Sequence, residues 1–333
     1  MIECSEGGAG PGEARTVERI VDSHCHIAST RYIPRSFIEG AVSNMALSLR
    51  GRGVEVSREL LADRFTAKMA DDRCDELVAE MDAAGITCAA LLFIDFRFAC
   101  GDCEWDLAGL LAAHVDVLKR HPNRFVLFAG IDPRSGQAGV DLLERSARDG
   151  EVAGLKLYPP CGFDAADPRL DPLFEVCADY GLPVLVHTGA TSPALCFDTS
   201  RPETLDRPAR RFPSVNFIMA HGSTHYVDEC VMMCAYRPNI YLDISAYQAM
   251  PLAHLAPLFT RQINHKILFG TDWPVFRLQG TQRAFVDQLL GPQGVLRHLH
   301  QRELEAIFHD TFEALLAGPA GRTLAPAAQI GAI

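Results

Sequence analysis

Several features that would place the protein in other classes are missing from its sequence. No uncharged apolar run of about 18 residues occurs, so we expect no membrane-spanning helix and no membrane partner. The first twenty residues contain no basic stretch followed by an apolar one, so we expect no secretory signal. No low-complexity linker and no internal repeat divides the 333 residues, which favours one large domain over several small ones.

Positive charge is also scarce. With 42 acidic and 31 basic residues the formal net charge is -11, and the basic surface that phosphate backbones require is missing. We therefore expect no nucleic-acid partner. The chain contains eleven cysteines, and without an export signal these indicate free thiols in a reducing compartment. The composition predicts a cytoplasmic protein that acts on a small molecule.

Short apolar runs alternate with amphipathic, helix-like stretches along most of the chain. Runs such as Ala89–Ile94 are apolar throughout, which is typical of strands buried on both faces of a parallel sheet. The eight candidate strands are residues 19–24, 87–94, 124–131, 152–157, 182–187, 215–221, 240–244 and 266–271. The clearest candidate helices are residues 75–84, 107–121, 140–148, 170–180, 226–237 and 282–290.

This alternation predicts an α/β fold, a (β/α)8 TIM barrel, with an open doubly wound sheet as the alternative. One barrel domain is expected over residues 17–317. Residues 29–70 are too many for an ordinary loop after the first strand, so we interpret them as an inserted lid over the barrel mouth. Residues 1–16 and 318–333 lack a periodic pattern and are expected to form a flexible N-terminal tail and a C-terminal tail.

Four of the candidate strands end in histidine or aspartate. His24 and His26 stand two residues apart at the end of the first strand, so both point to the same side of it. The fifth, sixth and eighth strands end at His187, His221 and Asp272. All strand ends of one polarity share one face of a barrel, so these side chains are expected to converge there.

Neutral imidazoles and a carboxylate suit a divalent metal ion with one position left for water or substrate. A single histidine at a strand end is more often a hydrogen-bonded surface residue. The combination at the ends of several barrel strands favours the metal interpretation. His298 and His300 have the same spacing as the first pair, but they lie in a polar, helix-like region outside the barrel, so we interpret them as surface residues.

These motifs, taken in order, resemble the amidohydrolase superfamily, and within it the amidohydrolase-2 branch of metal-dependent TIM-barrel enzymes. The motifs are Asp-Ser-His-Cys-His (22–26), Gly-Leu-Lys-Leu-Tyr-Pro-Pro (154–160), Val-His-Thr-Gly (186–189), Ala-His-Gly (220–222) and Gly-Thr-Asp-Trp-Pro (270–274). The resemblance covers about residues 20–316. It implies that His24, His26, His187 and Asp272 are metal ligands. It also implies that His221 is a ligand or a substrate-facing acid or base.

Lys156 leaves the number of metal ions open. Its motif is similar to the fourth-strand motif in which related enzymes carboxylate a lysine to bridge two metals, whereas single-metal relatives keep a similar lysine unmodified. We expect one divalent ion, with zinc as the first candidate and manganese, iron or cobalt as alternatives. Two ions remain possible, and in that case a carboxylated Lys156 and His221 would be additional ligands. A lysine desolvated near a metal has a lowered pKa, which suits carboxylation or a catalytic role.

Hydrolysis of an amide, ester or lactone is the expected activity. A bound metal lowers the pKa of its water and polarises a carbonyl, and Asp272 would act as general base. His221 could polarise or protonate the substrate oxygen. The same ligands could serve a non-oxidative decarboxylase or a hydratase, members of which the amidohydrolase-2 branch includes. A barrel that binds a ligand without turnover is a third interpretation, which the complete ligand set disfavours.

Candidate substrate contacts lie in the loops, which are expected to set the specificity for a small, carboxylated or aromatic substrate. An arginine of the lid could pair with a substrate carboxylate. The candidates are Arg31 and Arg35 in the lid, Tyr158 at the fourth strand, Tyr247 after the seventh, and Trp273 and Arg277 after the eighth. A homodimer formed through outer helices or tails is plausible.

Overall fold

Eight parallel strands form the core of the structure, a computed structural model that describes residues 13–318. Their order in the sheet follows the chain, β1-β4-β5-β6-β7-β8-β9-β10. The strands are β1 (Ile20–Cys25), β4 (Ile86–Leu92), β5 (Phe125–Gly130), β6 (Gly154–Leu157), β7 (Val184–Val186), β8 (Phe217–Met219), β9 (Ile240–Asp243) and β10 (Ile267–Leu268). Each overlaps one of the eight expected strands, so the predicted (β/α)8 barrel is confirmed.

Backbone hydrogen bonds between the first and last strands close the barrel. Ser23 N donates to Phe269 O at 2.9 Å, Asp272 N to His24 O at 2.7 Å and His26 N to Trp273 O at 2.7 Å. The segment that follows β10 therefore continues alongside β1 beyond the end of the regular strand. This seam joins the two strand ends that carry the first two histidines and the aspartate.

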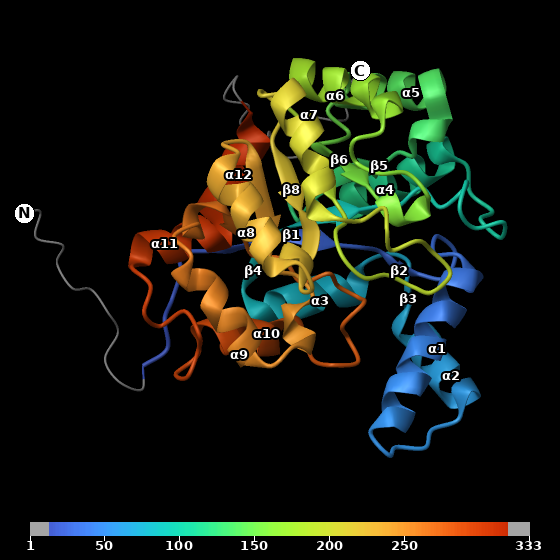
Figure 1. The fold of residues 1–333 in the computed structure, drawn as a ribbon. Coiled ribbons are helices and arrows are strands. Elements are labelled where there is room, and N and C mark those ends of the chain that lie inside the picture. The colour runs from blue at the N-terminus through green and yellow to red at the C-terminus, as the bar shows by residue number, and fades with distance from the viewer. Residues whose placement is uncertain (1–12, 319–333) are drawn as a thin grey trace, which may run out of the picture.

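Helices between the strands surround the barrel (Figure 1). They are α3 (Asp75–Ala84), α4 (Leu107–Arg120), α5 (Gly136–Arg148), α6 (Asp171–Tyr180), α7 (Asp206–Arg211), α8 (Val227–Tyr236), α9 (Leu252–Leu255) and α10 (Gln282–Leu290). Local signals fix several of their ends: Asp106 caps α4 by accepting a hydrogen bond from Gly109 N, and Gly85, at φ 76°, ends α3.

The N-terminal end of the barrel is filled by apolar side chains and covered by the last helix, α12 (Thr311–Ala317), which follows α11 (Gln301–Glu305) along the chain. Leu185 lies two residues before His187, so its side chain points to the same side of β7, into the barrel. It belongs to a buried cluster that includes Phe128 and Phe312, whose rings stack with their centroids 6.1 Å apart. The core therefore fills one end of the barrel, and polar side chains occupy the other.

The segment expected to be a lid forms a helical hairpin. It consists of α1 (Arg35–Gly51) and α2 (Arg58–Lys68), and a short antiparallel pair of strands, β2 (Ala28–Ser29) and β3 (Ala70–Asp71), closes its base. In Figure 1 the hairpin projects from the barrel. The base of the hairpin leaves and rejoins the barrel at the same place, so the insertion does not disturb the order of the strands.

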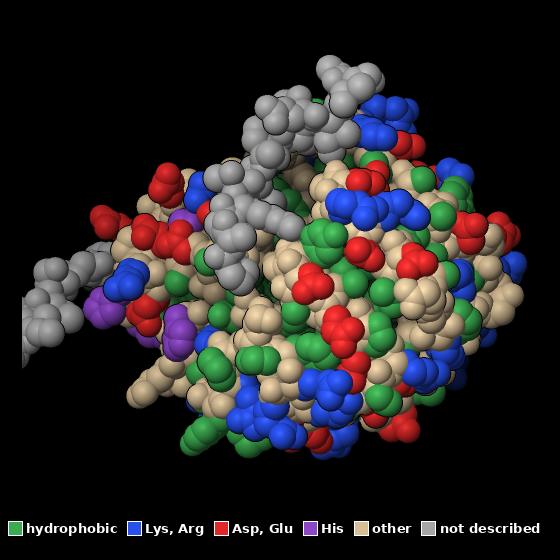
Figure 2. Space-filling model, turned by 90° about the horizontal axis from the view of Figure 1, so that it is seen from above, with side chains coloured by type: hydrophobic (Ala, Val, Ile, Leu, Met, Phe, Trp, Pro, Cys, Tyr) green, Lys and Arg blue, Asp and Glu red, His purple; other side chains and the backbone are tan. Residues whose placement is uncertain are grey.

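Acidic and basic side chains are interspersed on the face that Figure 2 shows, which is the face covered by α5, α6 and α7 in Figure 1. Ion pairs connect these helices: Arg207 and Arg211 of α7 pair with Asp171 of α6, at 3.0 and 3.1 Å. Among the described residues, no helix is both long and apolar enough to cross a membrane.

The two expected tails fall mostly outside the described residues, which leave out 1–12 and 319–333. Arg15, within the stretch expected to be flexible, is buried. Its guanidinium donates to the carbonyl oxygens of Arg297 and Leu299 at 3.1 and 2.9 Å. The folded domain therefore includes Arg15, although the sequence pattern placed the start of the domain at residue 17.

We predict that Gly130→Ala destabilises the barrel. A Cβ at Gly130, the last residue of β5, would collide with the backbone carbonyl of Phe93, which cannot move aside as a flexible side chain can. Overpacking of this kind costs about 1–3 kcal/mol. The free energy of unfolding in urea, compared with that of the wild type, measures the effect.

Gly51→Ala is the matched control, because a Cβ at the end of α1 meets no atom within 4 Å. Its free energy of unfolding should stay within about 0.5 kcal/mol of the wild type. Equal stability of the two variants would contradict the packing that the structure gives to the β4–β5 contact.

Candidate active site

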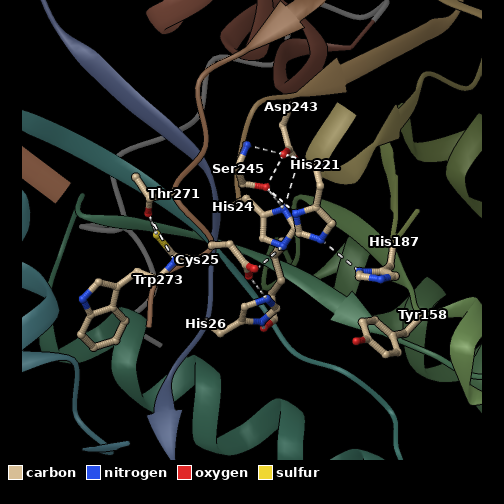
Figure 3. Close-up of polar contacts among 12 residues, drawn as sticks. His24, Cys25, His26, Tyr158, His187, His221, Asp243, Ser245, Thr271 and Trp273 are labelled. Carbon is tan, nitrogen blue, oxygen red and sulfur yellow. Dashed lines mark hydrogen bonds and ion pairs between the residues drawn. The ribbon is translucent and has the colours of Figure 1, made fainter. Parts of the chain in front are cut away.

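Six polar residues from five strand ends line one cavity at the C-terminal end of the barrel. They are His24 in β1, His26 just after it, Lys156 in β6, His187 after β7, His221 after β8 and Asp272 after β10. Figure 3 labels the four histidines among them. The convergence expected from the strand ends is therefore present in the structure. All six are almost completely buried except His26, whose side chain is 13% exposed.

The closest group among them consists of His24, His26 and Asp272, whose candidate ligand atoms lie within 4.8 Å of one another. Asp272 Oδ1 is 3.5 Å from His24 Nε2 and 3.2 Å from His26 Nε2. Asp272 has a φ of 52°, in the left-handed region that costs a non-glycine residue about 1 kcal/mol or more. Strain of this kind persists where the surroundings hold a side chain in a required place.

Each of these two histidines uses its other ring nitrogen for a structural hydrogen bond. His24 Nδ1 lies 2.9 Å from Asp243 Oδ2, and His26 Nδ1 lies 2.7 Å from the carbonyl oxygen of Leu92. Both partners can only accept, so Nδ1 carries the proton in each ring and Nε2 presents a lone pair. Two lone pairs and a carboxylate oxygen then face one another without a proton to share.

A divalent cation would remove the repulsion among these three electron-rich atoms, so the residues present fit a metal ion. Burial lowers the pKa of His24 well below the ordinary value, which keeps its imidazole in the neutral form that binds metals. Burial likewise raises the pKa of Asp272, an effect that a neighbouring cation would offset. His24, His26 and Asp272 would hold the ion, and the carbonyl of Leu92 and Asp243 would orient the two rings.

His221 and His187 form a second pair beside this group. His221 Nε2 lies 3.0 Å from His187 Nδ1, while His221 Nδ1 lies 2.8 Å from Ser245 Oγ, and His187 Nε2 lies 3.1 Å from the carbonyl oxygen of Ala190. Burial lowers the pKa of both imidazoles, that of His187 to about 3. His187 lies outside the group with Asp272. Three of the four predicted ligands therefore cluster directly, and the fourth joins them through His221.

Asp243 connects the group around Asp272 with the pair formed by His187 and His221. This fully buried carboxylate accepts hydrogen bonds from His24 Nδ1, from the backbone N–H of His221 at 2.9 Å and from the hydroxyl of Ser245. With His24 and His221 it forms another group whose candidate ligand atoms lie within 4.8 Å of one another. Asp243 and Ser245 are not among the site residues predicted from the sequence. The signal was nevertheless present, because Asp243 ends a barrel strand as Asp272 does.

Lys156 supplies the only buried ammonium at the cavity among the described residues. Its Nζ has no hydrogen-bond partner there and lies 6.0 Å from the centroid of the Tyr158 ring. Burial lowers the pKa of Lys156 to about 8, partly offset by the charges of Asp272 and Asp243. A buried ammonium without a hydrogen-bond partner is able to pair with an anionic group.

The remaining walls of the cavity, which has a volume of about 410 Å³, are mostly apolar. The inserted segment and the residues that flank it contribute Ile27, Tyr32, Ile33, Phe37, Met45, Phe65 and Met69. The barrel loops contribute Phe93, Phe96, Met250, Val275 and Phe276, and α4 contributes Leu110. No arginine of the described part of the chain lines it. The inserted segment therefore forms part of the substrate chamber, which has a polar floor and an apolar wall.

Residues 21–317 match the family model described as Amidohydrolase. The chain belongs to this family. It is the amidohydrolase-2 branch that the sequence motifs resemble, so that expectation is confirmed. No curated protein matches this chain in sequence.

Solved structures similar to this chain share its fold at low sequence identity. An uncharacterised TIM-barrel protein from Bordetella bronchiseptica is 22% identical, with a TM-score of 0.66 over 91% of this chain and 100% of that one. The 5-carboxyvanillate decarboxylase of Novosphingobium aromaticivorans, solved with manganese, is 13% identical, with a TM-score of 0.64 over 92% and 99%. A 2,6-dihydroxybenzoate decarboxylase from Rhizobium is 16% identical, with a TM-score of 0.58 over 90% and 99%.

The predicted substrate contacts are largely corrected by the structure, since of the six only Tyr158 lines the cavity. Its hydroxyl lies 2.6 Å from Thr191 Oγ1, and its ring centroid lies 4.5 Å from that of His187. Trp273 lies next to Asp272, but adjacent residues point in opposite directions, and Figure 3 shows its indole away from the histidines. Arg277 stacks on that indole and pairs with Glu76 and Glu80 of α3.

The other three predicted contacts also lie away from the cavity wall. Tyr247 belongs to the loop after β9. It is only 1% exposed and does not line the cavity. Arg31 packs over the Trp105 ring and lies 3.8 Å from Asp72, and Arg35 extends into solvent beside Glu39. These arginines follow the outer side of the inserted segment, whereas its apolar side chains face the chamber.

We predict that the purified protein contains a divalent metal, close to one ion per chain, and that His24→Ala loses most of it. The variant removes one of the facing lone pairs, so the remaining donors bind the ion more weakly. Elemental analysis gives the metal-to-chain ratio. Added metal at a hundredfold excess over its dissociation constant should stabilise the wild type by about 2.7 kcal/mol. A ratio near two would instead indicate two ions and a carboxylated Lys156.

His298→Ala serves as the control, because His298 is exposed and stands two residues before His300, the same spacing as in the first histidine pair. This variant should keep the wild-type metal content. Full metal content in His24→Ala would refute the proposed metal centre.

Proposed function

We propose that the protein is a metal-dependent carboxy-lyase that removes carbon dioxide from a small aromatic or enoic acid without an oxidant. The observation that carries this proposal is the composition of the chamber, in which one histidine–aspartate group and one unpaired ammonium face a wall that is otherwise apolar. The family match and the two decarboxylases of similar fold support it. The sequence alone had favoured hydrolysis, with decarboxylation as the alternative.

An acid would enter with its carboxylate toward the polar floor and its ring or chain against the wall. A carboxylate loses hydration in such a chamber, and Lys156 would compensate for that loss by a charge-assisted hydrogen bond. The bound divalent ion, zinc or manganese among the candidates, would supply positive charge for the acid's oxygens. The side chains of the hairpin would exclude water, which would otherwise compete for the same positions.

Asp272 would deliver the proton that replaces the carboxyl group. It makes both histidine contacts through Oδ1, which leaves Oδ2 to carry a proton to the substrate. The proton passes from Oδ2 to the carbon that bears the carboxylate, the carbon–carbon bond breaks, and its electron pair stays on that carbon. Carbon dioxide leaves, and Asp272 regains a proton from water.

Hydrolysis of an amide, ester or lactone is the second candidate. It is favoured by the paired nitrogens of His187 and His221, 3.0 Å apart, because such a pair suits a second metal ion next to Lys156. Asp272 would then take a proton from the attacking water and pass it to the leaving group. The two candidates use the same floor but differ in the bond that breaks.

We predict that metal-loaded protein releases carbon dioxide from at least one acid in a panel of hydroxylated aromatic and enoic acids. In heavy water the product should carry one deuterium at the carbon that lost the carboxyl group. Asp272→Asn, with its metal content verified, should lower this rate by about 10²- to 10⁴-fold, as expected for the loss of a general acid. Gas release and mass spectrometry measure both effects.

Asp141→Asn, an exposed aspartate of α5, is the control and should keep the wild-type rate. Turnover of lactones or amides together with no carbon dioxide from any acid would reject the carboxy-lyase in favour of hydrolysis. An unchanged rate in metal-loaded Asp272→Asn would remove the proposed acid from the mechanism.

Lys156→Met tests the role of the ammonium in binding. Loss of a charged hydrogen bond is worth about 1.5–3 kcal/mol, so acids should bind roughly 10- to 100-fold more weakly to this variant. Their methyl esters should bind equally to the variant and the wild type. Lys266→Met is the control, because Lys266 bonds to backbone carbonyls of Arg237 and Pro238 instead of facing the chamber. Equal loss for acids and esters would show that Lys156 acts only through packing.

A further inference from the structure

His114 is a polar residue in the wall of the chamber that does not belong to the metal group. It lies in the middle of α4 and is 2% exposed. Its ring packs between Phe93, at a centroid distance of 5.0 Å, and Tyr32 of the inserted segment, at 5.5 Å. A histidine among these aromatic rings is unexpected, since an apolar residue would fill the same space without burying polar atoms.

The hydrogen bonds of His114 define which nitrogen carries its proton. Nδ1 lies 2.7 Å from the carbonyl oxygen of Leu110, one turn earlier in α4. A carbonyl can only accept, so Nδ1 donates and Nε2 is left as an acceptor. Burial lowers the pKa of His114 to about 4, so the ring stays neutral at pH 7. No described residue donates a hydrogen bond to Nε2.

We propose that His114 Nε2 accepts a hydrogen bond from a hydroxyl group of the substrate and thereby selects hydroxylated acids. This inference rests on the proposed function, because it assumes an acid held at the floor of the same chamber. An acceptor in the chamber wall loses contact with water when a ligand fills the chamber, and a ligand hydroxyl compensates for that loss. An analogue without a donor leaves the acceptor unpaired and is rejected for the same reason.

The first experiment compares ligands that differ only in the donor. Calorimetry on metal-loaded wild-type protein measures the binding of 3- and 4-hydroxybenzoate, the corresponding methoxybenzoates and benzoate. A methyl ether keeps the oxygen and adds bulk, but it cannot donate. We expect at least one hydroxybenzoate to bind about 10-fold or more tightly than both its methyl ether and benzoate, as for one buried hydrogen bond. Equal binding of all five acids overturns the inference.

The second experiment identifies the acceptor atom with a pair of matched variants. In His114→Gln the amide oxygen can replace Nε2, whereas in His114→Asn the amide nitrogen replaces the Nδ1 donor and no acceptor reaches the chamber. We expect His114→Gln to keep a preference for the hydroxyl and His114→Asn to lose it, with a ratio of affinities near one. His114→Phe, which keeps the shape of the ring, should also lose it.

A preference for the hydroxyl that survives in both His114→Asn and His114→Phe overturns the inference. Loss of the preference in all three variants also overturns it, because the effect would then follow from repacking of α4 instead of from an acceptor. Failure of every acid to bind overturns it as well. Failure of the proposed function looks different: the acids bind with the expected preference, but no carbon dioxide is released.

Discussion

The proton positions on His24 and His26 constrain the whole site. Each ring donates Nδ1 to a fixed acceptor, Asp243 for His24 and the carbonyl of Leu92 for His26. Their Nε2 lone pairs are therefore directed at the carboxylate of Asp272, where no proton is available to separate them. In a buried environment three such acceptors repel one another. A cation removes this repulsion, so the metal affinity follows from how the rings are held as much as from the ligands themselves.

The seam of the barrel holds these groups in place. Asp22, fully buried, accepts hydrogen bonds from the backbone N–H groups of His24 and Thr271, both at 3.0 Å, and from the hydroxyl of Thr271 at 2.6 Å. One carboxylate thus fixes both chain segments that lead to the metal group. Burial raises the pKa of Asp22 to about 6, which indicates that the surrounding hydrogen bonds only partly offset its desolvation. This unfavourable desolvation of Asp22 occurs where β1 and the segment after β10 must keep their register.

Sequence patterns were informative about the barrel and about the floor of the site. The eight apolar runs and the residues that end them followed from the period of strands and from the common polarity of strand ends. The wall could not be derived in this way. Which face of the hairpin turns toward the chamber depends on tertiary packing, so Arg31 and Arg35 were chosen for their charge, whereas Phe37 and Met45 line the cavity. His114 was missed because a histidine in an amphipathic helix has the same pattern whether it faces the core or a cavity.

The apolar wall of the chamber also distinguishes the two candidate reactions better than its polar floor does. A histidine–aspartate group can serve the addition of water or the loss of a carboxyl group, and fold alone does not distinguish them. Hydrolysis requires water at the reacting carbon, whereas loss of carbon dioxide proceeds better where water is excluded and charge spreads over a ring. The apolar side chains contributed by α1 and α2 offer water no hydrogen-bond partner on their side of the chamber. Under the proposed function, Lys156 in the floor would pair with the carboxylate of an acid, and His114 in the wall would accept a hydrogen bond from its hydroxyl.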